Sequence, residues 1–286
     1  MRFSFLPILA VAQITLREML RQRVLLVAML FALLLIGGAC FFSQFSMDDQ
    51  AKFIKDWGHG VISTTALLIA LMGAGWLIPS EIERRTLHTT LTKPIRPSQF
   101  ILGKYIGLVG AITIVMLFLA CIFSLILVYK HLHFPMDPSA VNSAQLSDNQ
   151  VLAPNHTAFL DPSLLYAFCL IWLKICLLAA VAILFSTIAT STLFILALTL
   201  CVYFIGHLQS ILQEFWGRAD AGFAAFWFAK IIRALFPDFS VYHCIDSILA
   251  GQALSWQALG GLTGYSTLYI AILLCISMLL FEGREL

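Results

Sequence analysis

Apolar runs long enough to cross a lipid bilayer dominate this chain. A helix needs about 20 predominantly apolar residues to span the hydrocarbon core. Six stretches meet that requirement, at about residues 24–42, 60–78, 101–129, 164–188, 191–212 and 262–281. Only 11% of the 286 residues are charged, whereas about a quarter are charged in a soluble domain. The sequence therefore predicts an all-α integral membrane protein, with six transmembrane helices in one domain of residues 1–286.

The segment before the first run, residues 5–23, predicts an amphipathic helix. Gln13, Arg17 and Arg21 recur at helical spacing on one face. Leu9 and Leu16 belong to an apolar set on another face, which also includes Ala12, Met19 and Leu20. Such a helix is expected to lie along the membrane surface, where its two faces meet different solvents.

Lysine and arginine are distributed unequally between the two sides of the expected bundle. With the N-terminus inside, ten of them fall on the cytoplasmic side, six outside and one, Lys174, within a span. Because basic residues are enriched in cytoplasmic loops, both termini are predicted to be cytoplasmic. The external segment 213–261 mixes aromatic and charged residues, which favours an interfacial segment or a re-entrant hairpin over a seventh span.

Several chemical signatures are missing from the sequence. There is no G-x-x-x-x-G-K-[ST] phosphate-binding loop and no H-E-x-x-H zinc motif. The spans contain no pair of acidic residues, which argues against an intramembrane aspartyl protease and a carboxylate proton relay. We therefore expect no catalytic residue, no metal site and no cofactor in this chain.

The second cytoplasmic loop carries a helix-start signal. Ser80 and Glu83 have capping-box spacing directly after Pro79. Because the residue before a proline disfavours the helical conformation, Lys93 before Pro94 ends the helix. A helix of residues 80–93 is therefore expected. Two interpretations remain open: a charged loop that fixes topology, or a docking element for a cytoplasmic partner.

The loop also resembles a known family. The run IPSEIERRTLHTTLTKPIRPSQFILGKYIG, residues 78–107, resembles the signature loop of type-2 ABC exporter permeases. Weaker resemblances lie in the N-terminal helix with its arginines, in residues 234–240 and in residues 281–286. The sequence departs from the family pattern at Arg85, where a glycine is common, and at Pro97, near the family's arginine.

The resemblance implies the permease subunit of an ATP-driven exporter in the bacterial cytoplasmic (inner) membrane. It would pair with a second permease protomer, in contact with membrane lipid, and with a separate ABC ATPase that binds ATP and Mg²⁺; no nucleic acid is expected. The residues expected to couple the permease to the ATPase are Glu81, Glu83, Arg84, Arg85, Thr86 and Lys93. The alternatives are a secondary transporter or channel without an ATPase partner, and a membrane enzyme acting on lipid.

One basic residue is expected inside the membrane. Lys174 lies about ten residues into the run 164–188, roughly 15 Å from its outer end at ~1.5 Å per residue. A charge at that depth costs about 2.5–3.5 kcal/mol on insertion scales, so the side chain is expected to face a cavity or another helix. No acidic residue lies at matching depth. Candidate partners are a backbone carbonyl, water, a second protomer or an anionic cargo group; Lys174 is either part of a translocation path or a tolerated feature of packing.

Overall fold

A computed structural model describes residues 5–42, 50–77, 79, 97–133, 163–189, 191–216, 227, 230, 236–245 and 256–282 of the 286. The described chain is all-α. Its helices are α1 (Phe5–Leu20), α2 (Arg23–Phe42), α3 (Gln50–Leu77), α6 (Pro97–His133), α8 (Ser163–Ile188), α9 (Thr192–Trp216), the short 3-10 helix η2 (Ser240–His243) and α12 (Trp256–Glu282).

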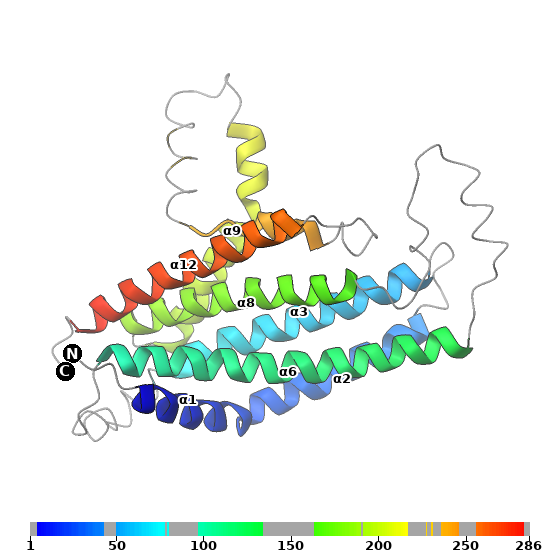
Figure 1. The fold of residues 1–286 in the computed structure, drawn as a ribbon, viewed down its shortest axis with the longest axis horizontal. Coiled ribbons are helices and arrows are strands. Elements are labelled where there is room, and N and C mark those ends of the chain that lie inside the picture. Colours follow the sequence, from blue (N-terminus) through cyan, green and yellow to red (C-terminus); the bar gives the residue numbers. More distant parts are fainter. Residues whose placement is uncertain are drawn as a thin grey trace.

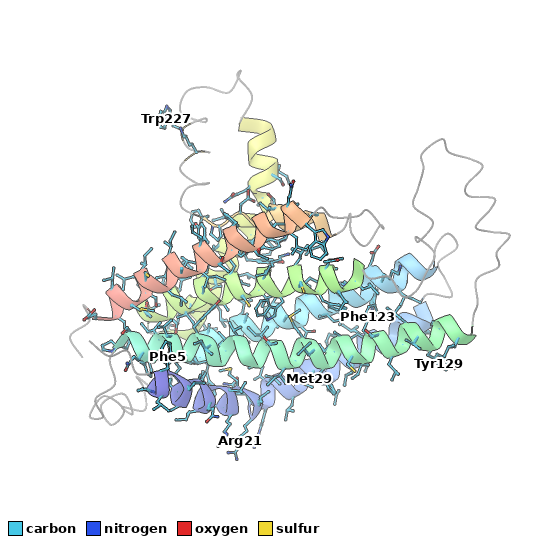
Figure 2. All side chains as sticks on the ribbon, in the orientation of Figure 1. Phe5, Arg21, Met29, Phe123, Tyr129 and Trp227 are labelled. Atoms are coloured by element: carbon cyan, nitrogen blue, oxygen red, sulfur yellow. The ribbon has the colours of Figure 1, made fainter. Side chains whose placement is uncertain are left out.

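Five of these helices are long and apolar enough to cross a membrane. They contain the candidate spans Phe53–Leu77, Pro97–Lys130, Leu164–Ile188, Thr192–Ile211 and Trp256–Glu282. A sixth arises if α1 and α2 count as one broken span, bent by 59° between Leu20 and Arg23. The exposed Arg21 lies at this bend and points away from the bundle (Figure 2). These findings confirm the prediction of an all-α membrane protein.

The long helices run back and forth along one axis, and α1 begins at the same end of the bundle where α12 ends (Figure 1). The central helix is α8, in which every residue from Ile175 to Ile183 is buried. Two hydrogen bonds tie α6 to it: Trp172 Nε1 donates to Thr113 Oγ1 at 2.8 Å, and the Tyr105 hydroxyl donates to the Cys176 carbonyl at 3.2 Å.

Some helices extend beyond the apolar runs in the sequence. Helix α3 begins at Gln50, ten residues before the expected start at 60, and α12 begins at Trp256, six residues before 262. The ten added residues of α3 include Lys55 and His59, whose side chains are nevertheless buried. Hydropathy measures the preference of the side chains for lipid. The backbone hydrogen bonds of a helix can continue into more polar residues when those residues pack against the rest of the protein. For that reason an apolar run is shorter than the helix that contains it.

Helix α1 lies against the first half of α6 (Figure 1), at a seam formed by two glycines. A Cβ atom added at Gly103 would lie 2.6 Å from Val11 Cβ, and one at Gly107 would lie 2.7 Å from the Ala12 carbonyl oxygen. This G-x-x-x-G spacing lets two helix backbones approach closely, as in membrane helix pairs generally. Beside the seam, Lys104 Nζ lies 3.9 Å from a Glu18 carboxylate oxygen.

The buried face of α1 includes Ala12 and Met19 of the apolar face expected from the sequence and departs from that face at Leu9. The buried residues are Ile8, Val11, Ala12, Thr15 and Met19. Leu9, which was placed on the apolar face, is 59% exposed. Gln13, Arg17 and Arg21 are exposed, as expected for the polar face.

The short segment 236–245 packs onto the bundle. Phe239 and Tyr242 are almost completely buried, the Phe239 amide donates to the Gly206 carbonyl at 3.1 Å, and Gln209 Nε2 donates to the Phe236 carbonyl at 3.1 Å. A side chain at Gly206 would overlap the Phe239 ring and come within 2.6 Å of the Pro237 carbonyl oxygen. This part of the expected external segment 213–261 is thus anchored to α9.

Candidate functional site

Lys174 meets a histidine from the neighbouring helix. Its side chain is half-buried, and its Nζ lies 3.0 Å from His207 Nε2 in α9. Of the two surroundings expected for this lysine, a cavity or another helix, the structure shows another helix. The partner, His207, was missed by the sequence analysis, which treated the histidines as scattered.

The register of a helical hairpin explains this pair. Helices α8 and α9 are joined by a short turn, and Lys174 lies 16 residues before Thr190 while His207 lies 16 residues after Ser191. In an antiparallel pair of helices, positions equally distant from the turn lie at the same height. The sequence therefore contained a signal for this contact, in the equal spacing of two polar residues around the turn.

The hydrogen bonds of His207 define how the pair holds its protons. His207 Nδ1 lies 3.3 Å from the Tyr203 carbonyl oxygen, an acceptor, so Nδ1 carries the proton. Nε2 is then free of a proton and accepts a hydrogen bond from the Lys174 amine. Since two adjacent cations would repel each other, the pair is expected to carry at most one positive charge.

Aromatic rings complete the surroundings of the pair. Lys174 Nζ lies 5.4 Å from the centroid of the Tyr203 ring, a cation–π distance. The His207 ring lies 4.5 Å from the Tyr203 ring and stacks on Phe239 at 6.0 Å, centroid to centroid. Because Phe239 belongs to the anchored segment 236–245, this segment covers the pair from the side of α9. The arrangement can hold one positive charge within the helical bundle.

The residues expected to couple to an ATPase cannot be placed. Glu81, Glu83, Arg84, Arg85, Thr86 and Lys93 all lie outside the described residues. Their flanks are described: α3 ends at Leu77 and α6 begins at Pro97. The loop therefore connects the end of α3 to the end of α6 that forms the glycine seam with α1.

Metal ligands do not gather in the part of the chain that the structure describes. Within it, no group of three or more histidine, cysteine or carboxylate side chains is close enough to hold a metal ion. The described cysteines, Cys121, Cys169, Cys176, Cys201, Cys244 and Cys275, are free thiols.

Comparison with known proteins gives one match. Residues 18–150 match a family model described as ABC-2 family transporter protein. No curated protein matches the chain. The matched range runs from the end of α1 through α2, α3 and α6, and it includes the loop 80–93 that resembles the signature loop of these permeases. Over residues 18–150 the chain is thus similar to the ABC-2 family transporter proteins, and this match supports the resemblance to type-2 ABC transporter permeases.

Proposed function

We propose that this chain is the permease subunit of an ABC exporter and that a separate cytoplasmic ATPase drives it. The single observation that carries the proposal is the family match over residues 18–150, which covers both the expected docking loop and the helix that follows it. In this arrangement two permease protomers, in the bacterial inner membrane with their termini in the cytoplasm, work with two ATPase subunits. ATP and Mg²⁺ bind to the ATPase.

The fold supplies a route from the loop to the membrane helices. Helix α6 begins at Pro97, four residues after the loop helix is expected to end at Lys93, and its first turns are joined to α1 through Gly103 and Gly107. A ligand shifts a conformational equilibrium only by the difference in its affinity for the two states. An ATPase that binds the loop differently in its open and closed states would therefore bias the position of α6 and α1 together.

The test is a coupling experiment on the assembled complex in liposomes. The double variant Glu83→Ala/Arg84→Ala should insert normally and lose most of its cargo-stimulated ATPase activity. The matched control removes an acid and a base from the opposite end of α3, with Lys52→Ala/Asp56→Ala, and should keep that activity. Normal assembly together with normal stimulated activity in the loop variant would overturn the assignment of the loop. Transport driven by an ion gradient without any ATPase would instead support the secondary transporter.

Lys174 is the proposed residue of the translocation path. Its support is the placement of this half-buried lysine within the bundle, with its Nζ 3.0 Å from His207 Nε2 of the neighbouring helix. Lys174→Met should preserve assembly and basal ATPase activity and should weaken transport of the native cargo. Full transport at an unchanged protein level would show that the lysine only serves packing.

A further inference from the structure

We propose that the pocket between α12 and the anchored segment 236–245 binds an organic ammonium ion. The pocket has a volume of about 480 Å³, and it is lined by Asp238, Val241, Ala258, Gly261, Leu262, Tyr265 and Tyr269. Sites for small molecules typically enclose ~300–1,000 Å³ and combine an apolar lining with a few fixed polar groups. The pocket fits that description, and Lys174 does not line it.

The charge of the pocket selects its ligand. Among the described residues that line it, Asp238 alone is charged, and it is an acid. Two aromatic rings accompany it: the Tyr265 and Tyr269 rings lie 5.7 Å apart, centroid to centroid, and are tilted by 48°. A carboxylate next to aromatic faces attracts a cation. Quaternary ammonium groups are recognised in this way, because they hold their water shell only loosely and lose it at little cost when they meet the negative face of a ring. Anions are disfavoured by the same groups.

The carboxylate is held in place before any ligand arrives. The backbone amide and the hydroxyl of Ser240 both donate to Asp238 Oδ1, and the backbone amide of Asp238 donates to the Tyr265 hydroxyl at 2.9 Å. No hydrogen bond or ion pair to Asp238 Oδ2 is recorded within the described part of the chain. One oxygen is therefore used to fix the side chain, while the other remains to face a ligand.

The surrounding segment is anchored as well. The Tyr242 hydroxyl is hydrogen-bonded to Ser266 in α12, and the Phe239 amide is bonded to Gly206 in α9. Ser266 and Tyr265 are adjacent in α12, so the segment is held to the same turn of the helix that lines the pocket. Preorganisation of this kind favours binding, because ordering the site then costs little.

Gly261 has no side chain and so leaves room in the pocket for a ligand. Gly261, Tyr265 and Tyr269 recur every four residues and so share one face of α12. A Cβ atom added at Gly261 would meet nothing within 4 Å, which shows that the room above this turn is open. Gly260 is equally open but does not line the pocket, so it offers a matched control.

The first experiment measures binding of choline by isothermal titration calorimetry to the full-length permease, purified in an uncharged maltoside detergent. Binding needs no ATP, so its outcome is independent of whether the chain couples to an ATPase. Asp238→Asn keeps an oxygen for Ser240 and removes the charge, and it should weaken binding by about tenfold or more. Gly261→Leu should abolish binding by filling the pocket, whereas Gly260→Leu should bind as the unmodified chain does.

The aromatic contribution has its own pair of variants. Tyr269→Phe keeps the ring and should retain binding, whereas Tyr269→Leu should lose it. Equal binding by Asp238→Asn and the unmodified chain, or equal effects of Gly261→Leu and Gly260→Leu, would overturn the proposal. So would the absence of choline binding together with no preference among lipids.

The same chemistry has two sources, a free ammonium compound or the headgroup of a lipid. In nanodiscs, phosphatidylcholine should compete with choline if the lipid headgroup is the ligand, and phosphatidylglycerol, which has no ammonium group, should not. Choline binding that is the same in both kinds of nanodisc would identify the free compound as the ligand.

Discussion

At the scale of single residues, the amine of Lys174 lies against the imidazole of His207 and the ring of Tyr203. A charge in a helical span costs about 2.5–3.5 kcal/mol on insertion scales. The hydrogen bond to His207 and the face of the Tyr203 ring offset part of that cost. The two side chains are thus expected to depend on each other.

A double-mutant cycle tests that dependence. His207→Leu removes the acceptor and should destabilise the protein by about 1–3 kcal/mol, because it leaves a buried amine without this partner. The double variant Lys174→Met/His207→Leu should recover much of the loss, since replacing both partners with apolar groups is close to neutral. The measurement is the apparent melting temperature in one detergent. Additive losses would show that the two side chains act independently.

The sequence predicted the depth of Lys174 and did not predict its partner. Depth follows from the position of a residue along one apolar run, so it can be read locally. The contact with His207 depends on how two helices are aligned, and the candidate partners named from the sequence did not include a histidine of the neighbouring helix. Asp238 was missed for a related reason. Its pocket is formed only when the segment 236–245 folds back against Tyr265 and Tyr269.

At the scale of helices, the closest packing joins α1 to α6. Gly103 and Gly107 bring the α6 backbone against Val11, Ala12 and Thr15 of α1. Interhelical contacts in lipid rely on close van der Waals packing more than on the hydrophobic effect, because lipid tails are as apolar as the side chains. A single added methyl group should therefore be felt strongly at this seam.

Substitution of the seam glycines tests this. Gly107→Ala places a Cβ 2.6 Å from Thr15 Cβ and 2.7 Å from a backbone oxygen, so the helices must separate. The expected loss of stability is about 1–3 kcal/mol, typical of overpacking. Gly110→Ala is the matched control on the same helix, because its Cβ would meet Leu16 at an ordinary 3.6 Å. A melting temperature that is equally unchanged in both variants would refute the close packing.

The same seam explains why Leu9, expected on the apolar face of α1, is exposed while Ala12 and Met19 of that face are buried. Helix α1 carries apolar residues on more than one side, and Leu6, Leu9 and Ile14 are all exposed. The pattern of α1 alone cannot choose between these faces, because the choice is made by the shape of α6. The polar face of Gln13, Arg17 and Arg21 is exposed as expected, since charged side chains are seldom buried unless they are paired.

At the scale of the molecule, the two ends of the helical bundle are expected to face opposite sides of the membrane. Helix α12 ends at Glu282, at the end of the bundle where α1 begins, whereas Tyr129 near the end of α6 lies at the opposite end (Figures 1 and 2). From the excess of basic residues on one side of the predicted topology, we expect the first of these ends to be cytoplasmic.

Cysteine labelling of intact cells tests this orientation. In a background without the seven native cysteines, Leu132→Cys at the exposed end of α6 should react with an impermeant thiol reagent added outside. Glu282→Cys should react only after permeabilisation, and it serves as the internal control. Reversed labelling would place the termini outside and remove the loop 80–93 from the reach of a cytoplasmic ATPase.

Helix α6 is long enough for a small rotation at one end to move its other end by several ångströms. Its 37 residues are unbroken from Pro97 to His133 and, at ~1.5 Å per residue, measure roughly 55 Å, well beyond a hydrocarbon core of about 30 Å. A rigid rod of that length magnifies small rotations: a tilt of about 5° at the end joined to the loop would move the far end by roughly 5 Å. Helix α1 packs closely against the end of α6 that follows the loop. We therefore expect the two helices to rotate together at that end, with little bending of α6.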